Sequence, residues 1–117
     1  GPTSAEPEIP DDELSPRQRI AQGDVAYRQN CASCHGESGQ GVPNLFPPLS
    51  DSPIAADADQ AITSVLTGRE GDWGIMPAFS HLSDADIARI LTFVRQAFGN
   101  NLPPIQEAEV TAIRNEL

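Results

Sequence analysis

Cys31-Ala32-Ser33-Cys34-His35 is the stretch of the chain that decides its fold. The chain contains only two cysteines, and both lie in this pentapeptide. Two thiols separated by two residues and followed at once by a histidine form the C-x-x-C-H pattern, the attachment signature of a c-type haem. The pattern predicts that Cys31 and Cys34 form thioether bonds to one covalent haem c and that His35 binds its iron.

Two other interpretations of the pentapeptide remain open from the residues alone. Cys31, Cys34, His35 and His81 offer the ligand types of a zinc site. Structural zinc usually uses two paired clusters, however, and no second C-x-x-C or H-x-x-x-H occurs in the chain. A redox disulfide between the two cysteines would be expected in a βαβ context, which the sequence does not indicate.

The second ligand of the iron is open from the residues alone. The candidates are Met76, His81 or no residue of the chain. Met76 is the only methionine, and it precedes Pro77 in a polar stretch flanked by glycines. A methionine in an apolar helix is commonly a core-filling residue, but one in a polar loop before proline fits that use poorly. A Met/His pair is a known axial pair of cytochromes c, so we expect His35 and Met76 to be the metal ligands.

Composition limits the kinds of partner. Among 117 residues, 17 are acidic and 7 are basic, which gives a formal net charge of -10, and every basic residue is arginine. Binding to nucleic acid needs a basic face, so we expect no nucleic-acid partner and instead redox proteins with a basic docking face.

No apolar run reaches the roughly 20 residues that span a bilayer. Gly1-Pro2 resembles a protease-cleavage remnant, so we expect a signal peptide, membrane tether or further domain upstream.

The pattern of apolar residues predicts an all-α domain. Residues 1–13 are acidic and rich in proline, which is typical of a flexible lead-in or linker, and residues 14–117 form the expected domain. Helices are predicted over 16–29, from Asp57 or Asp59 to Gly68, over 83–98, and near the C-terminus. Long loops are predicted over 36–53 and 69–82. The terminal helix is expected to pack through Val110, Ile113 and Leu117.

The chain resembles the class I c-type cytochromes, in particular small bacterial monohaem domains. The resemblance covers about residues 23–100, and the haem motif, the methionine and the last long helix follow one another in family order. The matching stretches are 27–36, 39–43, 46–49, 76–79 and 82–100. The resemblance implies a cytochrome c-like fold, with about three main helices and a short terminal helix around one covalent haem.

The resemblance also implies roles for residues near the haem. In relatives, a proline carbonyl after the motif accepts a hydrogen bond from the second nitrogen of the histidine ligand, which fixes the imidazole. Pro47 is the candidate here, with Pro43 as an alternative in a similar Pro-x-Leu context. Trp73 either borders a haem propionate or is a packing residue.

Relatives cross their first and last helices closely, with a glycine on one helix facing an aromatic residue on the other. Here Gly23 and Tyr27 are expected to meet Ile90 and Phe93. Glycine costs a helix about 1 kcal/mol relative to alanine, and a close crossing explains why that cost is tolerated.

The function implied is electron transfer in a respiratory or dehydrogenase chain, by a carrier and not an enzyme. An alternative is a haem domain of a larger oxidoreductase, such as a dehydrogenase, nitrite reductase or terminal oxidase. A third is a catalytic or sensing haem to whose iron Met76 is not bound or is bound labilely. Because c-type haem is normally attached outside the energy-conserving membrane, we expect the domain in the periplasm or on that membrane's outer face.

Overall fold

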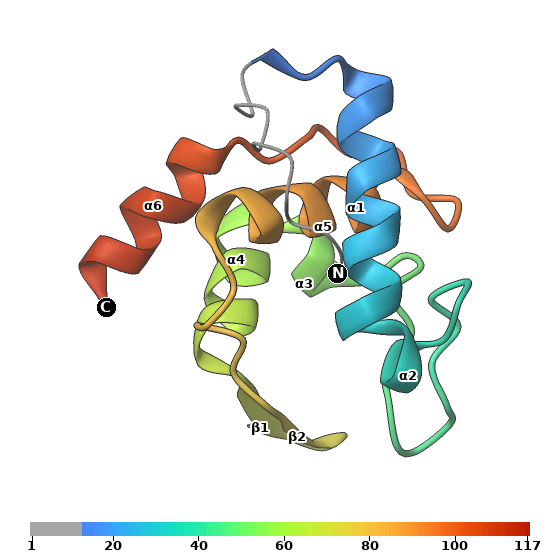
Figure 1. Cartoon of the computed structure of the whole chain (residues 1–117). Coiled ribbons are helices and arrows are strands. Elements are labelled where there is room, and N and C mark those ends of the chain that lie inside the picture. The colour runs from blue at the N-terminus through green and yellow to red at the C-terminus, as the bar shows by residue number, and fades with distance from the viewer. Residues whose placement is uncertain (1–12) are drawn as a thin grey trace.

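The computed structural model describes residues 13–117. The predicted lead-in therefore lies, except for Glu13, outside the described residues. In chain order the elements are α1 (Pro16–Asn30), α2 (Ala32–His35), α3 (Pro53–Ala56), α4 (Ala58–Thr67), β1 (Arg69–Gly71), β2 (Gly74–Met76), α5 (Asp84–Gln96) and α6 (Glu107–Glu116) (Figure 1). The predicted all-α class and the order of the helices are confirmed.

The crossing of α1 and α5 is the centre of the fold (Figure 1). A Cβ atom at Gly23 would lie 2.8 Å from the Cβ of Phe93 and closer still to the carbonyl oxygen of Arg89. Glycine at this position therefore lets the two helices approach closely. Next to the crossing, Tyr27 packs against Phe93 with ring centroids 5.4 Å apart, and Ile90 belongs to the same buried cluster. The predicted helix crossing is confirmed.

Helix boundaries follow local capping residues. Ser15 caps α1 in a reciprocal capping box with Gln18, and the hydroxyl of Ser83 accepts from the amide of Asp86 at the start of α5. Asp57 caps α4 through the amide of Gln60, which settles the alternative between Asp57 and Asp59. These side chains satisfy amides that have no partner inside the helix.

Residues 69–82, predicted as a loop, contain a short antiparallel hairpin instead. β1 and β2 pair with Arg69 opposite Met76 and Gly71 opposite Gly74. The expectation of no strand was wrong because each strand has three residues and β1 is exposed throughout, so no alternation of apolar and polar residues marks it. Met76 is therefore the last residue of β2 and not part of an irregular loop.

Two expectations near the C-terminus also need correction. α5 ends at Gln96, and Phe98 follows it with a positive φ of 57°. Its ring still contacts Tyr27 and Phe93, so it joins the core from a turn and not from the helical stripe. In α6, Val110 is buried and Ile113 packs against the core, but Leu117 is 66% exposed because it follows the last helical residue.

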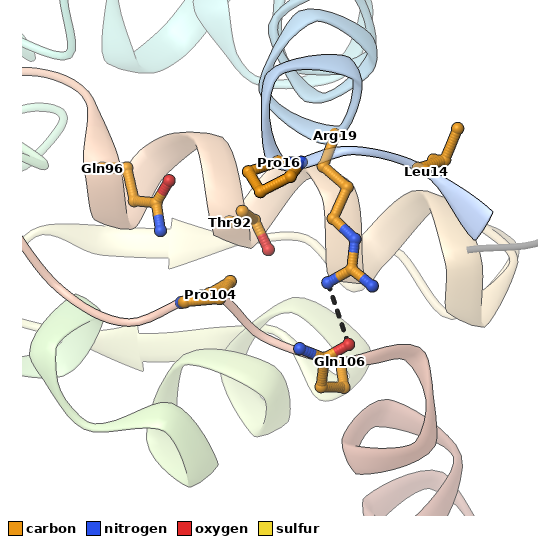
Figure 2. A pocket seen from close by; sticks show the side chains of 7 residues that line it. All are labelled: Leu14, Pro16, Arg19, Thr92, Gln96, Pro104 and Gln106. Atoms are coloured by element: carbon orange, nitrogen blue, oxygen red, sulfur yellow. Dashed lines mark hydrogen bonds between the residues drawn. The ribbon is translucent and has the colours of Figure 1, made fainter. Parts of the chain in front are cut away.

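A pocket of about 270 Å³ lies between the start of α1, α5 and the segment leading to α6. Figure 2 shows Arg19 reaching across it to Gln106, where its Nη1 donates to Oε1 at 2.8 Å. The pocket lining contains none of the residues of the C-x-x-C-H motif, so this hollow is separate from the haem site. Within residues 13–117, no helix combines the length and apolar character needed to cross a membrane.

Candidate haem site

The C-x-x-C-H motif forms its own short helix. α1 ends at Asn30, and Ala32 to His35 make the single turn α2. The amide of His35 donates to the carbonyl of Cys31 at 2.9 Å, so the turn places both thiols and the imidazole within one compact unit. Behind it, the hydroxyl of Tyr27 donates to the carbonyl of Gly36 at 2.7 Å. Burial and, as a smaller effect, the neighbouring Cys31 raise the pKa of the Tyr27 hydroxyl, so this donor stays protonated.

Nδ1 of His35 lies 2.9 Å from the carbonyl oxygen of Pro47. A carbonyl oxygen only accepts, so Nδ1 carries the proton and donates, while Nε2 keeps its lone pair. The hydrogen bond expected from the resemblance is present, and it involves Pro47 and not Pro43. It fixes both the tautomer and the orientation of the ring.

The loop after the motif is shaped to bring Pro47 to the histidine. Gly41 has a φ of 67°, and its amide donates to the carbonyl of His35 at 2.7 Å. A Cβ atom there would lie 2.9 Å from the Pro47 oxygen and closer to the carbonyl of Phe46. Both the positive φ and the close approach therefore require glycine. Further along the loop, Leu49 donates its amide to the carbonyl of Gly39 at 2.8 Å.

Asn100 ties the end of this loop to α5. Its Nδ2 donates to the carbonyls of Leu49, at 3.0 Å, and Val94, at 2.9 Å. Its Oδ1 accepts from the amide of Asp51 at 2.8 Å. The sequence indicated Gly99-Asn100 only as a helix stop, and no signal in the sequence points to these tertiary hydrogen bonds.

Met76 is the last residue of β2. Figure 1 places the hairpin on one side of the molecule's lower end and α2 with its following loop on the other. The position of Met76 thus depends on how the hairpin packs. Met76 is half-buried and packs against the apolar cluster of α4, α5 and α6. Trp73, in the hairpin turn, is 45% exposed. His81 is exposed and faces Phe79, with ring centroids 5.9 Å apart.

The residues present fit a covalently attached haem. Cys31 and Cys34 are both free, half-buried thiols, and the lone pair of His35 Nε2 is available to iron. Burial, followed by the neighbouring Cys34, raises the pKa of the Cys31 thiol to about 11. A redox disulfide motif needs the opposite shift, toward thiolate. Within residues 13–117, no three histidine, cysteine or acidic side chains gather as metal ligands, so the structure does not support the zinc interpretation.

Comparison with known proteins identifies the family. Residues 18–94 match the family model described as cytochrome c oxidase, cbb3-type, subunit III. The chain is 32% identical to cytochrome c-552 of Thermus thermophilus over 115 residues, which cover 81% of this chain and 77% of the relative. The chain belongs to this family of c-type cytochrome domains. It therefore carries covalently bound haem c and functions in haem-based electron transfer.

Other relatives are larger proteins. The chain is 35% identical over 91 residues to the cytochrome c subunit of a quinone alcohol dehydrogenase from Gluconobacter oxydans, covering 69% of this chain. It is 41% identical over 87 residues to the cbb3-type cytochrome c oxidase subunit FixP of Azorhizobium caulinodans, covering 68% of this chain. The chain spans only 19% of the first relative and 29% of the second.

Proposed function

We propose that this chain passes single electrons between redox partner proteins, with His35 and Met76 as the two axial ligands of its haem iron. The hydrogen bond from His35 Nδ1 to the Pro47 carbonyl, at 2.9 Å, is the observation that carries the proposal. It holds the imidazole in the tautomer whose Nε2 can bind iron, and a ligand that does not reorient suits a group that changes oxidation state repeatedly.

Different residues of the chain would have different roles at the haem. When bound, haem c supplies a one-electron couple between ferric and ferrous iron. Cys31 and Cys34 would hold it covalently, so that it is not lost between electron transfers. The thioether of Met76 would favour the reduced state and raise the potential. Met76 itself packs against the apolar cluster of α4, α5 and α6.

Binding of Met76 to the iron would also argue against catalysis by this domain. With both His35 and Met76 on the iron, no coordination site would remain open for a substrate. The domain is therefore a carrier and not an enzyme by itself. A labile Met76 would instead make a catalytic or sensing haem.

The hairpin is the proposed contact surface for a basic redox partner. Trp73 and Ile75 are 45% and 76% exposed, and the neighbouring Glu70 and Asp72 are exposed acids. An apolar pair beside negative charge suits a small, weak and rapidly exchanging interface. Because β2 ends at Met76, a partner bound there would lie close to the proposed iron ligand.

The setting of the domain in a whole protein has two candidates. Its coverage of 77% of a cytochrome c-552 favours a shuttle or tethered carrier. Its coverage of 19% and 29% of larger dehydrogenase and oxidase subunits favours a haem domain of an oxidoreductase. In either setting, we propose a position in the periplasm or on the outer face of the cytoplasmic membrane, where c-type haem is attached.

A potentiometric titration of the haem-loaded protein, followed by carbon monoxide addition to the reduced form, tests the proposal. We expect one reversible one-electron transition and no carbon monoxide binding at neutral pH. Rapid, tight binding of carbon monoxide would indicate an open iron site and would favour the catalytic or sensing alternative.

A further inference from the structure

Arg114 on α6 binds the segment that joins Met76 to α5. Its Nη1 donates to the carbonyl of Ser80 and its Nη2 to the carbonyl of Leu82, both at 2.8 Å. Its Nε donates to Oδ1 of Asp84, the first residue of α5, at 2.7 Å. One guanidinium therefore holds three points along a stretch of five residues, and such charge-assisted hydrogen bonds are among the stronger ones in proteins.

The guanidinium is itself held in place. The second carboxylate oxygen of Asp84 accepts from the hydroxyl of Thr111 at 2.6 Å. Thr111 lies one turn before Arg114 on α6. The side chain of the neighbouring Val110 is buried in the apolar cluster, so this helix is packed against the core. The side chains of Arg114 and Asp84 are only 31% and 23% exposed, so solvent screens the pair only in part. α6 is thus a fixed support for the segment.

The segment between Met76 and α5 has no regular secondary structure. The amide of Phe79 donates to the carbonyl of Val65 at 2.7 Å, and that of Leu82 to the carbonyl of Phe79 at 3.0 Å. Arg114 adds two hydrogen bonds to carbonyls of the same segment. Loss of the guanidinium would leave these two carbonyls dependent on water, and fewer contacts would then hold the segment to the core.

We propose that Arg114 is a positioning residue that keeps Met76 on the haem iron by fixing this segment to α6. The inference rests on the proposed role of Met76 as a ligand. The family match ends at residue 94, so the support comes from a helix that lies beyond the matched part of the chain. α6 then controls how readily the methionine leaves the iron, in addition to covering the core.

Binding of a competing ligand measures this control. Imidazole can reach the ferric iron only when Met76 has left it. Its apparent Kd is therefore the intrinsic Kd divided by the fraction of protein in this open state. Weakening the support raises that fraction, and the apparent Kd for imidazole falls. In protein that lacks the Met76 sulfur, the support has no ligand to hold and its loss changes nothing.

The experiment titrates haem-loaded ferric protein with imidazole at neutral pH for the parent, Arg114→Gln, Met76→Ala and the double variant. Arg114→Gln is expected to lower the apparent Kd about tenfold, the scale of lost charge-assisted hydrogen bonds. Met76→Ala is expected to lower it further, and the double variant to match Met76→Ala. Arg28→Gln removes the same charge from an exposed pair with Asp24 and is expected to leave the Kd at the parent value.

The outcomes separate the two proposals. A Kd unchanged by Arg114→Gln beside a much lower Kd in Met76→Ala overturns the inference alone, as does an equal effect of Arg114→Gln with and without Met76. Equal Kd values in the parent and Met76→Ala overturn the ligand assignment and the inference with it. Should Arg114→Gln fail to accumulate, Arg114→Lys, which retains one donor group and the charge, is expected to give an intermediate Kd.

Discussion

His35 Nδ1 and the carbonyl oxygen of Pro47 are 2.9 Å apart, although the two residues lie twelve positions apart in the chain. Backbone hydrogen bonds also stabilise the chain around this loop, from the amide of Gly41 to the carbonyl of His35 and from the amide of Leu49 to the carbonyl of Gly39. The orientation of the proposed iron ligand is thus set by backbone geometry, which holds it without needing another polar side chain.

Gly41→Ala tests that loop geometry. The substitution places a Cβ against the Phe46 and Pro47 carbonyls at a φ of 67°, and a residue forced into such a region costs about 1–3 kcal/mol. We expect the free energy of unfolding to fall by that amount in denaturant titrations. Gly71→Ala is the matched control because a Cβ there would meet nothing within 4 Å. Equal stability of the two variants would contradict the proposed constraint.

Gly23→Ala tests the helix crossing. The added methyl meets the Arg89 carbonyl and the Cβ of Phe93, and overpacking of this kind typically costs about 1–3 kcal/mol. The loss is expected in thermal or denaturant unfolding despite the better helix propensity of alanine. Val25→Ala, on the same helix at a 57% exposed position, is expected to change stability by no more than about 0.5 kcal/mol. A more stable Gly23→Ala protein would show that the crossing leaves room.

Asp84 predicts a loss of stability in acid. Burial alone would raise the pKa of this carboxyl, but hydrogen bonds from Thr111 and Arg114 and the charge of Arg114 outweigh it, so the pKa is lowered. A lowered folded-state pKa contributes stability above the unfolded value of about 3.9 and loses it as the pH falls through the folded value. Urea titrations at a series of pH values, from neutral to below about 3.9, measure the free energy of unfolding. This free energy is expected to decline less for Asp84→Asn than for the parent as the pH falls. Parallel declines would exclude Asp84 as a source of the acid sensitivity.

The hairpin surface predicts salt-dependent electron transfer. With a basic partner protein, the second-order rate is expected to fall as ionic strength rises, because salt screens attraction between exposed charges. Glu70→Gln combined with Asp72→Asn is expected to lower the low-salt rate and flatten the dependence. The same two changes at Glu107 and Asp59, exposed or half-exposed acids on α6 and α4, serve as the charge-matched control. If the control pair has the larger effect, the partner docks elsewhere.

Local chemistry explains why much of the fold was predictable. Ser15, Asp57 and Ser83 cap helices through contacts within three residues, so the sequence contains both partners of each bond. The C-x-x-C-H motif was predictable because few residue types satisfy its chemistry, whereas the Gly23 crossing was expected from the resemblance to class I c-type cytochromes. The exposed three-residue strands of the hairpin carry no comparable pattern.

The supports of the site were not predictable because they depend on tertiary contacts. Asn100 binds the carbonyl of Leu49, and Arg114 binds the carbonyls of Ser80 and Leu82. Carbonyl groups occur at every residue, so the sequence does not indicate which ones an amide or a guanidinium will meet. Phe98 reached the core from a turn for the same reason, since its ring contacts depend on how the chain leaves α5.

Met76→Ala provides the most direct test of the account, through absorption spectra of the ferric protein and the midpoint potential. We expect the parent to show the long-wavelength absorption band of a methionine sulfur on ferric haem iron. The variant is expected to lose that band, to have a lower potential and to bind added ligands. Retention of the parent's spectrum and potential in Met76→Ala would contradict the assignment of Met76 as the second axial ligand.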